Sequence, residues 1–292
     1  DNIQAVELLQ EAKAENWNQL LSEGKLGILA LLRNLRSILL TNPTKDVMSM
    51  VVNLLTDPKR ILQGKIMPYQ FDLAYEVIKN EFNSPVSRVI LEMLQIAYQI
   101  ALPNLEEMLQ GNNLVIFDQS GSMWMQNGRL QLSNRTRYNS LAGDKAIQIA
   151  KTLAKATNAD VIRFGQNAEF IGYDPSNLNL LSVDDWKKNL GRTNLEAAWR
   201  LAAASGRKYE RVFILSDYEC NRGNTYAGYQ AYVNNVGNPY VYQVDLAAYG
   251  TTQQVGPKVR YYYGFGYGMF DDITKSEFNA SYHLDKVRAI KI

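Results

Sequence analysis

The stretch NNLVIFDQSGSMWMQ, residues 112–126, decides how the rest of the chain is interpreted. It begins with an apolar run that predicts a buried strand over 114–118. The run ends in alternating oxygen-bearing side chains at Asp118, Ser120 and Ser122. Such a loop directs one carboxylate and two hydroxyls toward one point, and these hard ligands suit Mg²⁺, Mn²⁺ or Ca²⁺. Asp and Ser are also common in turns and helix caps, so the motif alone leaves both interpretations open.

The composition is that of an ordinary soluble globular protein. The 292 residues are 46% hydrophobic and 21% charged, and this length favours two domains. No apolar run reaches the ~18–20 residues that span a bilayer, and no secretory signal is visible. We therefore expect a cytoplasmic protein without a membrane segment. The first residue is Asp1 rather than Met, which we interpret as a fragment or a processed product.

A single cysteine and a single histidine restrict the chemistry further. Cys220 cannot form an internal disulfide, fits a reducing compartment and is interpreted as structural. A Cys/His zinc site is nearly excluded, and Ser-His-Asp catalysis would have to use His283, for which no partner is evident. No activated nucleophile or cofactor-binding loop is visible. We therefore expect that the protein is not an enzyme.

The first part of the chain is predicted to be helical throughout. Apolar residues recur at three-four spacing over 26–40, 46–56 and 87–102, and another amphipathic helix is predicted over 67–80. Asn-Pro, Asp-Pro and Ser-Pro pairs separate these segments. Four or five antiparallel helices predict part of an α-solenoid, although no sequence repeat is evident.

The second part of the chain alternates strands and helices. Strands are predicted over 114–118, 159–165, 168–173, 211–217, 238–246 and 259–265, and helices over 144–157 and 195–205. This alternation predicts an α/β fold with a mostly parallel sheet covered on both faces, in which ligands bind outside the carboxyl ends of the strands. Asp118 and Asp217 both occupy such ends. We expect two domains, 1–110 and 111–292.

Two further loops are able to complete the coordination of an ion. Gly191-Arg192-Thr193-Asn194 places Thr193 at a helix start, and Ser216-Asp217 places a second carboxylate at a strand end. The predicted metal site therefore consists of Asp118, Ser120, Ser122, Thr193 and Asp217. Glu219 is a candidate acceptor that orients water on the ion.

This order of motifs resembles the von Willebrand factor A domain with its metal-ion-dependent adhesion site. Asp118, Ser120 and Ser122 match the family's DxSxS, Thr193 matches its threonine loop and Asp217 its strand-end aspartate. The resemblance implies a doubly wound, mostly parallel sheet. It also implies a bound Mg²⁺, with Mn²⁺ or Ca²⁺ as alternatives, whose open coordination position takes a carboxylate from a partner.

The helical part resembles the end of a TROVE module, the HEAT-like helical-repeat domain of Ro autoantigen proteins. Leu31-Leu32-Arg33-Asn34-Leu35 and Pro68 match that module's LLRNL helix and its following x-x-P-x-x segment, and FGYGMFDDI (265–273) resembles the family's closing segment. A full module is much longer than residues 1–110, so the resemblance covers its last part. Family members bind small structured RNAs, which implies an RNA-binding, non-catalytic protein of a ribonucleoprotein.

The net charge is unevenly distributed. Residues 1–110 carry 10 Lys+Arg against 13 Asp+Glu, a net charge of −3, and residues 111–292 carry 21 against 16, a net charge of +5. Attraction to RNA should therefore lean on the second part. Arg33 and Arg36 are candidates for RNA contacts, and the plainer alternative is ion pairing on a solvated helix face.

Two segments of the second part are further candidates for contacts. Arg129, Arg135 and Arg137 lie in a polar insert after the metal loop, where they would contact RNA or a partner, or simply belong to a solvated loop. The tyrosines of YYYGFGYG (261–268) are candidate platforms for single-stranded bases, or part of a buried edge strand.

Two alternatives to RNA binding stay open at this point. The first is a structural protein that uses the same scaffold for protein contacts, for example within a phage virion or another large bacterial assembly. The second is a metal-dependent hydrolase. The expected partner is accordingly a small structured RNA, or a protein that carries an acidic side chain to the metal site.

Overall fold

The computed structural model describes residues 2–125, 141–180, 182–247, 249–264, 267–279, 281–282, 285 and 288–289. The chain divides into two compact units, Asp1–Glu107 and Met108–Ile292, which are described separately below. In this described part, no helix has the length and apolarity that a membrane crossing requires.

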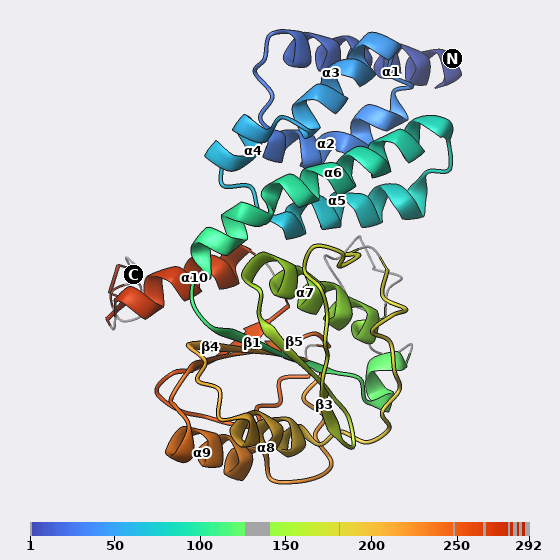
Figure 1. Cartoon of the computed structure of the whole chain (residues 1–292). Helices are drawn as coiled ribbons and strands as arrows, with labels where there is room; N and C mark the ends of the chain where they lie inside the picture. Colours follow the sequence, from blue (N-terminus) through green and yellow to red (C-terminus); the bar gives the residue numbers. More distant parts are fainter. Residues whose placement is uncertain are drawn as a thin grey trace. The chain divides into compact units, whose positions relative to one another are not determined.

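The first unit is built from helices. They are α1 (Asn2–Ser22), α2 (Ile28–Leu40), α3 (Lys45–Leu55), α4 (Pro58–Gln63), α5 (Pro68–Glu81) and α6 (Pro85–Met108) (Figure 1). The Thr44 and Asp57 side chains begin α3 and α4 by accepting hydrogen bonds from backbone N–H groups three residues further on. Pro58 and Pro68 occupy first turns, where the missing N–H of proline removes no helical hydrogen bond.

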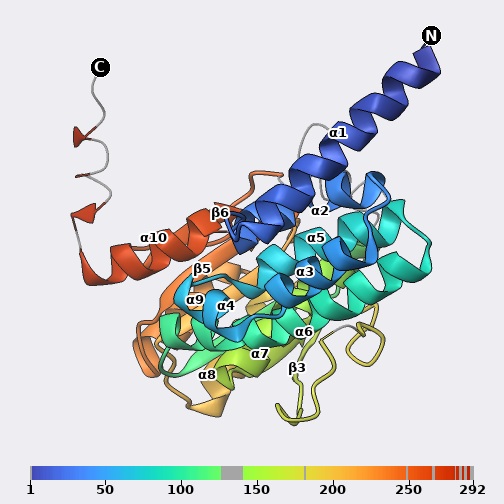
Figure 2. The ribbon, with the colours of Figure 1, turned by 90° about the horizontal axis from the view of Figure 1, so that it is seen from above.

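The core of the first unit comes from one apolar face of each helix. Leu31, Leu35 and Ile38 lie at three-four spacing on α2 and are fully buried, and α2 packs against α3 and α5 (Figure 2). The helix predicted over 87–102 extends to Met108 through Pro103. Its last turns are retained because Leu102, Leu105 and Asn104 are buried, and the Asn104 amide donates to the Ile61 and Ile66 carbonyls at 3.1 and 2.8 Å.

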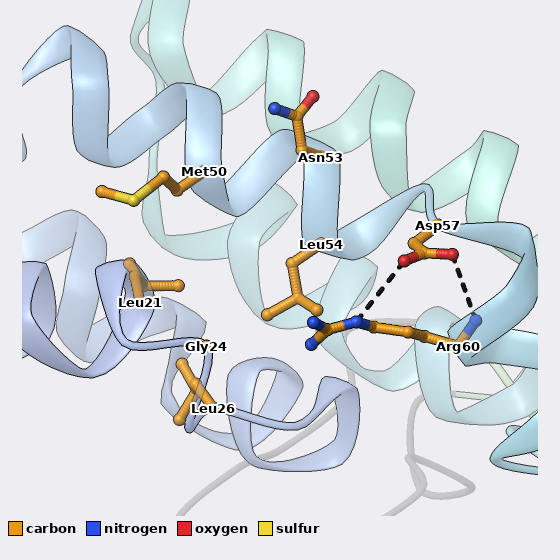
Figure 3. A pocket seen from close by; sticks show the side chains of 8 residues that line it. All are labelled: Leu21, Gly24, Leu26, Met50, Asn53, Leu54, Asp57 and Arg60. Carbon is orange, nitrogen blue, oxygen red and sulfur yellow. Dashed lines mark hydrogen bonds and ion pairs between the residues drawn. The ribbon is translucent and has the colours of Figure 1, made fainter.

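A cavity of about 210 Å³ lies in the first unit (Figure 3). Its lining residues are Leu21, Gly24, Leu26, Met50, Asn53, Leu54, Asp57 and Arg60. The Asp57 carboxylate already has partners within the protein, because it caps α4 and pairs with the Arg60 guanidinium at 3.4 Å. The cavity therefore combines apolar side chains with the polar groups of Asn53, Asp57 and Arg60.

The second unit is an α/β sandwich. Its elements are β1 (Asn113–Asp118), the 3₁₀ turn η1 (Gly121–Trp124), α7 (Ala142–Thr157), β2 (Asp160–Phe164), β3 (Ala168–Phe170), α8 (Leu195–Ser205), β4 (Arg211–Ser216), α9 (Thr225–Asn235), β5 (Tyr240–Asp245), β6 (Val259–Tyr263) and α10 (Tyr267–Phe278). The six strands lie in the order β3-β2-β1-β4-β5-β6, and only β3 is antiparallel to its neighbour. This is the doubly wound sheet of the von Willebrand A type.

Helices cover both faces of this sheet. Helices α8 and α9 lie on one face, and α7 and α10 lie on the other (Figure 1). Because side chains alternate along a strand, Leu114 and Ile116 of β1 pack toward Trp199 of α8, and Val115 and Phe117 face the opposite side. All four of these β1 residues have no solvent exposure, which explains why the strand appears in the sequence as a continuous apolar run.

In the described part of the second unit, the structure has two helices, α9 and α10, where the sequence pattern predicted none. Helix α9 carries few aliphatic residues, but Thr225, Gly228, Tyr229 and Tyr232 are buried at three-four spacing. A Cβ on Gly228 would lie 3.1 Å from the Trp199 Cβ, so the glycine lets α9 approach α8 closely. Aromatic rings supply the burial that aliphatic periodicity usually signals.

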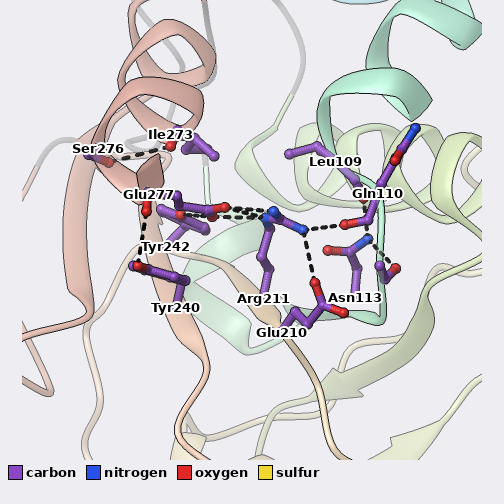
Figure 4. Close-up of polar contacts among 11 residues, drawn as sticks. Leu109, Gln110, Asn113, Glu210, Arg211, Tyr240, Tyr242, Ile273, Ser276 and Glu277 are labelled. Carbon is purple, nitrogen blue, oxygen red and sulfur yellow. Dashed lines mark hydrogen bonds and ion pairs between the residues drawn. The ribbon is translucent and has the colours of Figure 1, made fainter. Parts of the chain in front are cut away.

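Helix α10 is anchored on the sheet by a buried ion pair, shown in Figure 4. Two guanidinium nitrogens of Arg211 on β4 donate to Glu277 on α10 at 2.8 and 2.6 Å, and a third donates to the Gln110 carbonyl at 2.5 Å. The Tyr242 hydroxyl donates to the same carboxylate. Both charged side chains are more than nine-tenths buried, so each depends on the other.

Candidate metal centre

The DxSxS loop starts at the last residue of β1. Asp118 is fully buried, and its Oδ1 accepts a hydrogen bond from the Ser120 N–H at 2.7 Å. Its Oδ2 accepts from the Ser216 hydroxyl at the end of β4, at 2.5 Å. The Ser120 and Ser122 hydroxyls lie 3.3 Å apart, so the alternating spacing does turn both toward one point.

The loop that carries Thr193 hydrogen-bonds directly to the DxSxS loop. The Gly121 N–H donates to the Gly191 carbonyl at 2.7 Å, and the Leu190 N–H donates to the Gln119 carbonyl at 2.8 Å. These contacts place Thr193, which is 2% exposed, next to the DxSxS loop although the two lie some seventy positions apart in the chain.

Asp217 approaches from the carboxyl end of β4. Its Oδ1 accepts from the Glu219 N–H at 3.1 Å, and the residue is 2% exposed. The segment after Asp217 also contacts the loop that carries Thr193, because the Asn221 N–H donates to the Thr193 carbonyl at 3.2 Å. All five predicted metal-site residues therefore lie on three loops that hydrogen-bond to one another, at one edge of the sheet.

Two buried carboxylates, those of Asp118 and Asp217, lie close together at this edge of the sheet. Burial raises the pKa of Asp118 to about 7, and the nearby Asp217 carboxylate contributes to the same increase. Burial also raises the pKa of the Cys220 thiol to about 12, with Asp118 as the next cause. Two close carboxylates out of contact with water are an arrangement that a cation would stabilise.

The donor set fits a hard divalent ion. Two carboxylates and three hydroxyls are oxygen ligands of the kind that Mg²⁺ binds, and none of them is a sulfur or imidazole that zinc would favour. Among the residues described, no three His, Cys, Asp or Glu side chains form a cluster of metal ligands. The hydroxyls of Ser120, Ser122 and Thr193 would accordingly have to complete the coordination.

The remaining predicted residues have different surroundings. Glu219 is exposed, and its carboxylate lies beside the site. Arg36 pairs with Glu81 on the first unit, which is the alternative left open by the sequence, whereas Arg33 is exposed and has no ion pair within the described ranges. Arg129, Arg135 and Arg137 lie outside the described residues, as does His283.

The sequence did not predict the residues that hold Asp217 in place. Tyr218 adopts a left-handed conformation with φ of +57°, which is uncommon for a bulky side chain. Its carbonyl accepts hydrogen bonds from the Thr251 hydroxyl and the Gln253 amide at 3.1 and 2.9 Å, and its N–H donates to Ser216 Oγ at 2.9 Å. The only signal in the sequence was the position of Ser216 and Tyr218 on either side of Asp217.

A pocket of about 600 Å³ opens beside the five residues. It is lined by Gly121, Ser122, Met125, Gly191, Arg192, Thr193, Tyr218, Glu219, Cys220, Asn221, Tyr249, Thr251 and Gln253. Ser122 and Thr193 lie at its wall, so a group entering the pocket would reach the candidate metal position. The remaining lining combines polar side chains with Met125, Cys220 and the side chains of Tyr218 and Tyr249.

The fold and the sequence both match known proteins. Residues 5–147 match the TROVE domain model, a match that passes through the DxSxS loop into α7. The Ro (RSR) protein of Deinococcus radiodurans has a similar structure, with a TM-score of 0.71 and 19% identity over 87% of this chain and 54% of that one. The chain thus spans about half the length of the Deinococcus protein.

Two other solved structures have lower similarity. They are an aerotolerance-related membrane protein of Bacteroides fragilis, with 21% identity over 46% of this chain and 66% of that one and a TM-score of 0.33, and the BatB protein of Bacteroides thetaiotaomicron, with 20% identity over 58% and 88% and a TM-score of 0.32. TM-scores this low add nothing to the argument. The chain has no significant match among curated proteins. Residues 5–147 thus match the TROVE domain family, and the fold of this chain is similar to that of about half of the Deinococcus Ro protein.

Proposed function

We propose that this chain is a Ro-like, non-catalytic RNA-binding protein that carries a divalent-metal adhesion site. The observation that carries the metal site is the convergence of Asp118, Ser120, Ser122, Thr193 and Asp217 on three interlocked loops. The TROVE match supports the RNA-binding part and favours it over the particle-assembly alternative.

The five residues would hold Mg²⁺ or a similar ion through oxygen atoms. The ion would supply an open coordination position for an acidic group of a partner. The protein's own contribution is rigidity: Ser120 and Glu219 backbone N–H groups each hold one oxygen of Asp118 and Asp217, and this fixes the direction of both carboxylates. A preorganised site loses less entropy when it binds its ligand.

Binding rather than catalysis fits the groups around the site. The Cys220 thiol has a pKa of about 12 and stays protonated, so it is a poor nucleophile. Ser120 and Ser122 share a hydrogen bond with each other, and no imidazole lies near them within the described residues. A serine nucleophile here therefore lacks the imidazole base of a Ser-His-Asp arrangement.

Titration calorimetry with Mg²⁺ tests the metal site. We expect Asp118→Ala to abolish Mg²⁺ binding and to keep the fold, because the site lies at the rim of the sheet. Asp174→Asn is the control, since Asp174 is an exposed loop carboxylate that accepts from Ser176 and lies outside the site. Unchanged Mg²⁺ affinity in the Asp118 variant would refute the site.

Gel-shift measurements with a small structured RNA test the RNA-binding part. We expect binding at low ionic strength that weakens as salt is added, because contacts to phosphates release counterions. An absence of binding at low salt would remove the proposal. Mg²⁺-dependent turnover of nucleotides or phosphoesters would contradict the non-catalytic assignment.

A further inference from the structure

Gln119 lies between the first two residues of the DxSxS motif and is not one of the candidate metal ligands. The residue has no solvent exposure, although glutamine is seldom fully buried. All four of its hydrogen-bonding groups have partners. Its backbone N–H donates to the Phe164 carbonyl at 2.7 Å, and its side-chain Nε2 donates to the Asp118 carbonyl at 3.0 Å. A buried amide with every group paired is fixed in place.

The two acceptors of Gln119 both hold the segment that leads to Thr193. The Lys188 N–H donates to the side-chain Oε1 at 3.0 Å, and the Leu190 N–H donates to the backbone carbonyl at 2.8 Å. In a sheet, two such N–H groups would be received by two carbonyls of the neighbouring strand. The chain leaves β1 at Asp118 to form the metal loop, so the Gln119 side chain supplies the second acceptor instead.

The segment that Gln119 holds has no regular secondary structure of its own. Between β3 and α8, the described residues 171–180 and 182–194 form no helix or strand. On the side away from Gln119, the Gln166 N–H donates to the Leu190 carbonyl at 2.9 Å. A Cβ on Gly165 would collide with the Leu190 Cβ, so the loop after β2 packs directly against this residue. Leu190 is therefore held between two loops, as a central strand is held between its neighbours.

The position of Leu190 decides where Thr193 lies. Gly191 turns the chain directly after Leu190 with a φ of +74°, and its carbonyl accepts from the Gly121 N–H at 2.7 Å. Thr193 follows only two residues later and is buried. A shift of residues 188–190 away from Gln119 would therefore carry the Thr193 hydroxyl away from the two serine hydroxyls of the motif.

We propose that Gln119 is a positioning residue that fixes Thr193 for a small octahedral ion and so gives the site a preference for Mg²⁺ over Ca²⁺. Mg²⁺ requires nearly ideal octahedral geometry with ligands at about 2.0–2.1 Å, whereas Ca²⁺ accepts flexible arrangements of oxygens at about 2.3–2.6 Å. A rigidly held hydroxyl therefore favours the smaller ion. This inference rests on the proposed metal site and adds the residue that sets its selectivity.

Titration calorimetry of the full chain with Mg²⁺ and, separately, with Ca²⁺ tests the inference. Gln119→Met keeps the length of the side chain and removes both amide groups. We expect its Mg²⁺ affinity to fall by about tenfold or more, as for other residues that orient metal ligands, and its Ca²⁺ affinity to fall clearly less. Gln119→Asn keeps a buried amide but is too short to reach Lys188, so it should lower the same selectivity even if the Met variant does not fold.

Asn113→Leu is the matched control for the loss of a buried amide. Asn113 lies at the opposite end of β1, is 3% exposed, and donates to the Leu109 and Gly111 carbonyls at 2.7 and 3.0 Å. This variant should unfold at a lower urea concentration and keep the ratio of Mg²⁺ to Ca²⁺ affinity. An equal loss of selectivity in Asn113→Leu would show that general loosening of the fold, rather than Gln119, controls the site.

Hydrogen exchange of the metal-free chain supplies a measurement that does not depend on the ion. The Lys188 and Leu190 amides should exchange faster in Gln119→Met than in the unmodified chain, and unchanged protection would contradict the proposal.

The two titrations also separate failure of this inference from failure of the proposed function. If the unmodified chain binds neither ion, the proposed metal site fails and the inference fails with it. If the chain binds Mg²⁺ but the Gln119 variants lower both affinities by the same factor, or lower neither, the inference is wrong and the metal site stands. Tighter binding of Ca²⁺ than of Mg²⁺ by the unmodified chain would likewise overturn the inference alone.

Discussion

Replacing Asp118 by asparagine should stabilise the metal-free protein while it destroys the metal site. In the folded state the carboxyl is fully buried near Asp217, and these two causes raise its pKa from 3.8 to about 7. Each pH unit of such an increase corresponds to about 1.4 kcal/mol. Ionised Asp118 therefore destabilises the folded state by about 4 kcal/mol above neutral pH when no cation is present.

The raised pKa of Asp118 makes the stability of the metal-free protein depend on pH. The folded state holds its proton more tightly than the unfolded state, so stability falls as pH rises from about 4 to about 7 and then stays low. Asparagine removes the charge and still accepts from the Ser120 N–H, but it disturbs the hydrogen bond from Ser216, which is worth about 1 kcal/mol. The expected net gain is about 3 kcal/mol at about pH 8, and it vanishes near pH 4.

Urea unfolding with a chelator, followed by tryptophan fluorescence, measures the difference. Trp124, Trp186 and Trp199, three of the four tryptophans, lie in the second unit and report on it. Saturating Mg²⁺ should stabilise the unmodified chain and leave the variant unchanged. The control is Asp174→Asn, where hydrogen bonds from Ser176 lower the pKa and the same substitution should lose stability. An Asp118 variant that is less stable at about pH 8, or a difference that does not depend on pH, would refute the reasoning.

Three further predictions concern the supports of the second unit. Glu277→Ala should lower the free energy of unfolding by about 3–5 kcal/mol, because it leaves the Arg211 guanidinium buried without its partner; urea unfolding measures this. Lys151→Met should destabilise by about 2–3 kcal/mol through the lost bonds to the Asn179 and Ser182 carbonyls at 3.0 and 2.7 Å, and protease cleavage within 174–190 should rise with it. Tyr218→Gly relieves about 1–2 kcal/mol of backbone strain but loses a fully buried ring worth about 3–5 kcal/mol, so calorimetry should show a lower melting temperature.

The convergence of the five candidate residues could be predicted because it follows from topology. Parallel strands place their carboxyl ends at one edge of a sheet, so predicting β1 and β4 as parallel strands was enough to bring Asp118 and Asp217 together. The DxSxS spacing then fixed the hydroxyls, since a turn that begins at a strand end carries alternate side chains inward. The local sequence pattern and the parallel arrangement of the strands were enough to predict that these side chains meet at one edge of the sheet.

The end of β3 and the presence of α9 depend on tertiary contacts that the sequence pattern does not reveal. The strand predicted over 168–173 stops at Phe170, because Tyr173 turns away to donate to the Ala154 and Ala159 carbonyls at 3.2 and 2.5 Å. Helix α9 depends on a glycine that fits against Trp199. Neither contact is visible to a rule that reads neighbouring positions alone.

Three adjacent parallel strands end in the same way, and their differences show which two carboxylates are available to the proposed ion. Asp118, Asp217 and Asp245 each accept a backbone N–H from two residues further on, at 2.7, 3.1 and 2.9 Å. The second oxygen of Asp245 is occupied by the Gly250 N–H and the Tyr261 hydroxyl, so this carboxylate is consumed in building the loop that carries Tyr249. The second oxygen of Asp118 has only a hydroxyl proton, and that of Asp217 has no hydrogen bond to any described residue. One repeated turn therefore leaves two carboxylates available for the proposed cation and uses the third to hold the loop that carries Tyr249.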